Sequence, residues 1–140
     1  MTALLLGLRL GGLLLIGLAF AHLPISRRFL WREESARLSP LNRQVLLVHA
    51  FFVALAVGMM GVWMLFWPRA LATPNALGVP VTAGLAIFWA IRLYVQWFVY
   101  DHALWRGKRF ETAVHVIFTL LWAYLALLFA LCLERQLGTG

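Results

Sequence analysis

The sequence predicts an all-α integral membrane protein built from four transmembrane helices. Its 140 residues are 64% hydrophobic and only 12% charged, and the mean hydropathy is +0.88. All three values lie outside the range of soluble globular domains. A transmembrane helix needs about 20 predominantly apolar residues, and four stretches satisfy this, namely 3–23, 44–67, 81–100 and 112–133. Because these runs are continuous rather than short and alternating, we expect one four-helix domain of two hairpins over residues 1–140, and not a β-barrel.

The first span, residues 3–23, carries the small residues Gly7, Gly11 and Gly12. Gly7 and Gly11 form a GxxxG pattern, which favours close contact with another helix. Residues 19–21, near the end of this span, form the small-x-small pattern that signal peptidase recognises. However, no basic residue precedes the apolar run and Arg9 interrupts it. We therefore expect an uncleaved membrane anchor, with cleavage as the alternative.

Basic residues gather in two of the three predicted loops, 24–43 and 101–111, which hold Arg27, Arg28, Arg32, Arg37, Arg43, Arg106, Lys108 and Arg109. The other side has only Arg9, Arg69 and Arg135. The positive-inside rule then places both basic loops in the cytoplasm and both termini outside, in a bacterial-type inner (plasma) membrane. Since the charge of +7 follows topology, it does not indicate nucleic-acid binding.

The connections between the spans carry their own signals. Apolar and aromatic residues among the arginines of segment 24–43 predict a short interfacial helix, and Asn42, after Pro40, is expected to cap the second span. Three prolines and a glycine in residues 67–80 predict an external loop.

Polar residues cluster towards the cytoplasmic ends of the spans, where all four histidines, His22, His49, His102 and His115, are expected. In the third span Arg92, Gln96 and Tyr100 are four residues apart, and Arg92 lies about 13 Å along the axis from Asp101. Glu111, His115 and Thr119 form a similar stripe on the fourth span. Ionisable residues inside a membrane are costly and are by default candidates for function.

We expect a small membrane protein with a redox or metal-binding role, whose site lies at the cytoplasmic end of the bundle, and three chemistries fit this constellation. His49 and His115 at matching depth are suited to axial ligation of haem b. A transition metal (zinc, iron or copper) is the second option, with ligands drawn from His49, His115, Glu111, His102, Asp101 and His22. The third is a quinone or lipid headgroup held by Arg92, Gln96 and His115 between aromatic walls. The residues expected to contact a cofactor are Arg92, Gln96, Tyr100 and Thr119.

Two alternatives need no cofactor at all. The chain can be an accessory or assembly subunit of a larger membrane complex, or a small transporter that works as an oligomer. The bilayer is the predicted partner, together with either further copies of the chain or a larger complex. Nucleophilic catalysis lacks support because the serines of segment 24–43 have no nucleophile-elbow context, and Cys132, the single cysteine, excludes an intramolecular disulfide.

Overall fold

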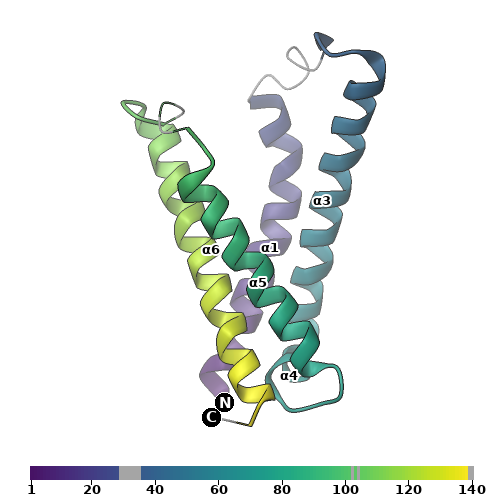
Figure 1. Ribbon diagram of the computed structural model, residues 1–140, viewed down its shortest axis with the longest axis vertical. Helices are drawn as coiled ribbons and strands as arrows, with labels where there is room; N and C mark the ends of the chain where they lie inside the picture. Colours follow the sequence, from purple (N-terminus) through teal and green to yellow (C-terminus); the bar gives the residue numbers. More distant parts are fainter. Residues whose placement is uncertain (29–35, 102, 104, 139–140) are drawn as a thin grey trace. The chain divides into compact units, whose positions relative to one another are not determined.

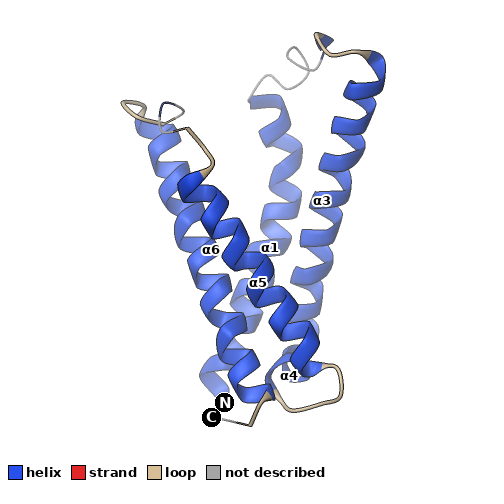
Figure 2. Ribbon diagram, in the orientation of Figure 1, coloured by secondary structure: helices blue, strands red, loops and turns tan. Residues whose placement is uncertain are grey.

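The computed structural model describes residues 1–28, 36–101, 103 and 105–138. Within this part the regular structure is helical, and no strand occurs (Figure 2). Its helices are α1 (Thr2–Arg28), α3 (Pro40–Phe66), α4 (Pro68–Ala72), α5 (Gly78–Phe98) and α6 (Arg109–Gln136) (Figure 1).

Four of these helices are long and apolar enough to cross a membrane: α3, α5, α6 and the Thr2–His22 part of α1. At 1.5 Å per residue, the 21 residues of α5 extend about 32 Å, close to the thickness of a bilayer's hydrocarbon core. The predicted all-α fold with four candidate spans is thus confirmed. The side on which the termini lie stays a prediction.

The chain divides into two compact units, Leu8–Pro68 and Met1–Gly7 with Arg69–Gly140. In the first unit α1 and α3 touch backbone to backbone at two glycines. A Cβ atom at Gly12 would lie 2.6 Å from the Gly61 carbonyl oxygen, and one at Gly61 would lie 2.9 Å from the Ile16 nitrogen. Cβ atoms do not fit at such distances, so these positions require glycine.

In the second unit α5 and α6 pack together along the hairpin (Figure 1). The buried residues of α5 include Thr82, Trp89 and Gln96, which recur every seven residues and define one stripe. The N-terminal segment joins α6 through the Tyr124 hydroxyl, which donates to the Gly7 carbonyl at 2.7 Å. A Cβ atom at Gly7 would lie 3.2 Å from Leu128 Cδ1, so this glycine also permits a close contact.

The C-terminal end of α6 is tied to the connection between α4 and α5 by one side chain. Gln136 is 7% exposed. Its Nε2 donates to the carbonyls of Leu71 at 2.9 Å and Thr73 at 2.8 Å, and its Oε1 accepts from the Asn75 N–H at 3.1 Å. A Cβ atom at Gly78 would overlap the Gln136 amide. Gln136 thereby satisfies the Leu71 carbonyl in a buried contact, whereas the Thr73 carbonyl also accepts from Asn75 Nδ2 at 2.9 Å.

Two predictions about the connections are wrong. The second span is capped by Ser39 and not by Asn42: Ser39 Oγ accepts from the Asn42 N–H at 3.4 Å, and Pro40 occupies the first turn, where a missing N–H costs nothing. The external segment 67–80 is not all loop, because Pro68 likewise begins the short helix α4. The predicted interfacial helix falls largely on residues 29–35, which lie outside the described residues.

Candidate functional site

A polar network joins α5 to α6, and we call its members, Arg92, Gln96, His115 and Trp122, the Gln96 cluster. Gln96 is only 6% exposed. Its Nε2 lies 2.8 Å from His115 Nδ1, and its Oε1 accepts from Trp122 Nε1 at 3.3 Å and from Arg92 at 3.4 Å. Gln96 lies two turns beyond Trp89 on the same buried stripe of α5. It therefore contacts polar side chains of both α5 and α6.

Aromatic rings enclose the cluster. The Arg92 guanidinium carbon lies 4.9 Å from the centroid of the Trp122 ring and 5.7 Å from that of Tyr100. Trp122 also stacks on Trp89, with centroids 5.2 Å apart. These contacts hold the plane of the guanidinium through cation–π attraction.

Arg92 has few polar partners in the part of its unit that the structure describes. Of its five N–H donors, one makes the hydrogen bond to Gln96. Among the described residues, no carboxylate makes an ion pair with it. Arg92 is half-buried on an apolar helix long enough to span a membrane. A cation in that position is stabilised by an anion or by access to water.

Residues 105–112, which lead into α6, are held together by contacts of Trp105. The Trp105 carbonyl accepts from the Lys108 N–H at 3.0 Å and from the Thr112 hydroxyl at 2.8 Å. Gly107 has a φ of 80°, which favours glycine. The Trp105 ring stacks on His115, with centroids 3.9 Å apart and planes at 12°. Trp105 thus covers one face of the His115 imidazole.

The basic residues of the predicted loop 101–111, Arg106, Lys108 and Arg109, are exposed. Asp101, predicted as a metal ligand, is exposed as well, and its Oδ1 accepts from the Ala103 N–H at 2.8 Å. This contact is a local turn of the kind that aspartate commonly makes. The described part of this loop therefore exposes three cationic side chains and one carboxylate.

The predicted metal ligands are not brought together in the described part of the chain, where no group of three or more His, Cys, Asp or Glu side chains could hold a metal ion. His49 is exposed, Glu111 and His22 are half-buried, and His102 lies outside the described residues. His49 and His115 belong to different units, so their pairing stays a prediction.

Within the first unit, the depths of His22 and His49 can be compared. Gly58 approaches Ala19, and Gly61 approaches Ile16. This antiparallel register places His22 level with residue 55, about 9 Å along the axis from His49. His22 Nδ1 lies 2.8 Å from the Leu18 carbonyl oxygen. Because a carbonyl only accepts, a neutral His22 in this contact donates from Nδ1–H and has its lone pair on Nε2.

The four predicted cofactor contacts have different surroundings. Arg92, Gln96 and Tyr100 lie together around the guanidinium. Thr119 lies on α6, and its hydroxyl oxygen is buried without a hydrogen-bond partner among the described residues, as is Trp89 Nε1. Binding of a cofactor by these residues stays a prediction.

Sequence reasoning missed the tryptophans of the site. Trp122 and Trp105 are not among the site residues predicted from the sequence, yet Trp122 donates a hydrogen bond to Gln96 and Trp105 stacks on His115. Trp122 follows Thr119 by three residues and so continues the polar stripe of α6. This three-residue spacing could have identified Trp122 from the sequence. No such pattern identifies Trp105, because loop residues show no helical periodicity.

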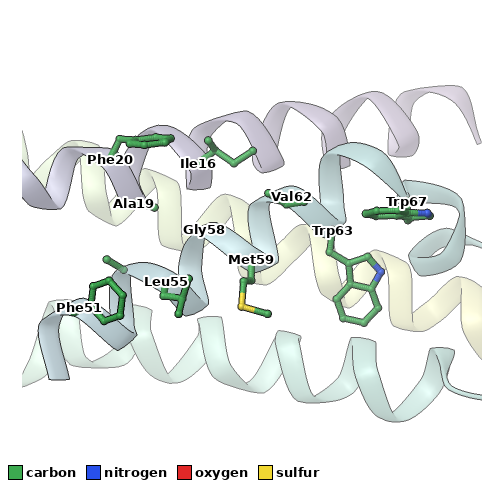
Figure 3. A pocket seen from close by; sticks show the side chains of 11 residues that line it. Ile16, Ala19, Phe20, Phe51, Leu55, Gly58, Met59, Val62, Trp63 and Trp67 are labelled. Atoms are coloured by element: carbon green, nitrogen blue, oxygen red, sulfur yellow. The ribbon is translucent and has the colours of Figure 1, made fainter. Parts of the chain in front are cut away.

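A separate apolar groove of about 550 Å³ runs along α1 and α3 (Figure 3). Its walls are Ile16, Ala19, Phe20, Phe51, Ala54, Leu55, Gly58, Met59, Val62, Trp63 and Trp67. No charged side chain lines it, so it differs in character from the Gln96 cluster.

Comparison of this chain with known protein families, with curated proteins and with solved structures finds no match. The functional argument therefore rests on the residues themselves.

Proposed function

We propose that this protein is a small membrane-embedded binding protein that holds an anionic amphiphile at Arg92. The observation that supports this is the guanidinium fixed against Trp122 and Tyr100, with a single hydrogen bond to Gln96 and no carboxylate partner among the described residues. A guanidinium held in one plane presents parallel N–H donors, which match a phosphate or carboxylate in bidentate fashion.

The membrane favours an anionic phospholipid as this amphiphile. Arg92 is about 9 Å along the axis from Phe98, the last residue of α5. The long side chain of an arginine at this depth can extend towards the headgroups. The exposed cations Arg106, Lys108 and Arg109 attract anionic lipids, at about 1 kcal/mol for each charge near the surface. A quinone, the neutral alternative, would use the hydrogen-bond donors but would leave the charge of Arg92 uncompensated.

The lipid content of the purified protein tests this proposal. The full-length protein would be extracted in mild detergent and washed with excess detergent, and its organic-extractable phosphorus measured. We expect the wild type to retain anionic phospholipid and Arg92→Gln to lose it. Arg69→Gln removes an exposed arginine of α4 and is the matched control, which should behave as wild type. Equal retention by Arg92→Gln and wild type would contradict the proposal, and a retained quinone would redirect it to the neutral ligand.

A second candidate is a histidine-held haem b or transition metal, and one contact favours it. The Nδ1–H of His22 donates to the Leu18 carbonyl, which is the second hydrogen bond that metal-ligating histidines commonly make. His49, His115, Glu111, His102 and Asp101 are the further proposed ligands. The ultraviolet-visible spectrum of oxidised and reduced protein, together with metal analysis, tests it. A protein that carries neither lipid, haem nor metal would leave the accessory-subunit and small-transporter roles.

A further inference from the structure

The Gln96 amide lies between partners that differ in hydrogen-bonding character. Its Oε1 faces Trp122 Nε1 at 3.3 Å and Arg92 at 3.4 Å. Both of these groups are donors only, since neither the indole N–H nor the guanidinium can accept a hydrogen bond. An amide turned by 180° would place its NH₂ group against two donors and lose both bonds. The orientation of the amide is therefore set by Trp122 and Arg92.

This orientation decides which nitrogen of His115 carries the proton. Gln96 Nε2 faces His115 Nδ1 at 2.8 Å, and an amide nitrogen only donates. Nδ1 must then accept, and in a neutral imidazole the proton is on Nε2. We infer that Gln96 is a positioning residue that holds His115 as the neutral Nε2–H tautomer, and so makes it a hydrogen-bond donor rather than a metal ligand.

The inference bears on the second candidate function. Ligation of a metal or haem iron needs a lone pair on an imidazole nitrogen. In this arrangement Nδ1 of His115 is occupied by the amide hydrogen and Nε2 by its own proton. His22 has the opposite arrangement, with Nδ1–H on the Leu18 carbonyl. The two histidines are thus prepared for opposite roles, and this holds whether or not Arg92 binds a lipid.

A single substitution should reverse the tautomer. In Gln96→Glu the side chain keeps its shape and one oxygen still accepts from Trp122 and Arg92. The second oxygen now faces His115 Nδ1, and because an ionised carboxylate accepts only, Nδ1 must carry the proton. The variant would also carry the carboxylate–histidine pair that accompanies many metal sites.

Nitrogen NMR of the full-length protein in micelles tests this inference. Histidine would be labelled with nitrogen-15, His115 assigned by comparison with His115→Gln, and spectra recorded at about pH 8, where free imidazole is neutral. In the wild type we expect Nδ1 of His115 to give a pyridine-type shift and Nε2 a pyrrole-type shift. In Gln96→Glu the two should exchange. Gln44→Glu, which adds the same charge at an exposed position on α3, should leave them unchanged.

A pyrrole-type Nδ1 in the wild type would overturn the inference, as would a folded Gln96→Glu protein with unchanged His115 shifts. If that variant does not fold, the wild type still decides. With glutamine and histidine both labelled, a coupling across the hydrogen bond from Gln96 Nε2–H to His115 Nδ1 requires an unprotonated Nδ1. Detection of that coupling would support the inference, and a proton attached to Nδ1 would refute it.

Discussion

Replacement of Gln136 by alanine should destabilise the Arg69–Gly140 part of the protein by about 2–4 kcal/mol. The side chain makes hydrogen bonds to the backbone of Leu71, Thr73 and Asn75 at 2.8–3.1 Å, plus a longer contact to the Ala70 carbonyl at 3.4 Å. Each hydrogen bond contributes about 1 kcal/mol net, and a buried backbone group left without a partner costs about 1–3 kcal/mol. Water that enters the space left by the side chain offsets part of this sum.

Unfolding of the detergent-solubilised protein by increasing mole fractions of SDS, followed by far-ultraviolet circular dichroism, measures the change. Gln44→Ala on α3 is the matched control, because Gln44 is exposed, and it should shift the free energy of unfolding by no more than about 0.5 kcal/mol. If Gln136→Ala were as stable as that control, the side chain would not brace the connection between α4 and α5, and the reasoning would be refuted.

Gly12→Ala and Tyr124→Phe test the packing of α1 by the same unfolding assay, with Gly17→Ala as the control for the first. Gly12→Ala places a methyl group 2.6 Å from the Gly61 carbonyl oxygen and should lower the free energy of unfolding by about 1–3 kcal/mol. Gly17→Ala, with no neighbour within 4 Å, should be neutral or slightly stabilising. Equal effects of the two substitutions would exclude the close approach of α1 and α3. Tyr124→Phe removes the hydrogen bond to the Gly7 carbonyl and should cost about 1 kcal/mol, and no change would place that hydroxyl in contact with water instead.

The helical architecture was predictable because apolar length is a direct physical requirement for crossing a bilayer. The sequence did not reveal which helix each small residue contacts. The GxxxG pattern pointed to Gly7 and Gly11, yet the contact with α3 is made at Gly12, and Gly7 meets α6. A pattern on one helix cannot identify the partner, because the partner's complementary glycine, Gly61, is distant in sequence.

The polar site was predictable in part. Four-residue spacing grouped Arg92 with Gln96 and Tyr100, and these do lie together. The same reasoning treated His115 as a ligand, because periodicity reports the face of a helix and not the donor or acceptor opposite it. Only the contacts of Gln96 with Trp122 and Arg92 show which nitrogen of His115 carries the proton. Hydrogen-bond direction depends on tertiary neighbours and is therefore inaccessible from spacing.

The central claim, that Arg92 binds a lipid anion, is tested most directly by native mass spectrometry of the delipidated protein titrated with phosphatidylglycerol or phosphatidylcholine. We expect wild type to bind one phosphatidylglycerol in preference to phosphatidylcholine, and Arg92→Gln to bind it about tenfold or more weakly, since charge-assisted hydrogen bonds contribute about 1.5–3 kcal/mol. Arg92→Lys should fall between them because it keeps the charge but lacks the planar fork. Equal affinities of wild type and Arg92→Gln for phosphatidylglycerol would contradict the account.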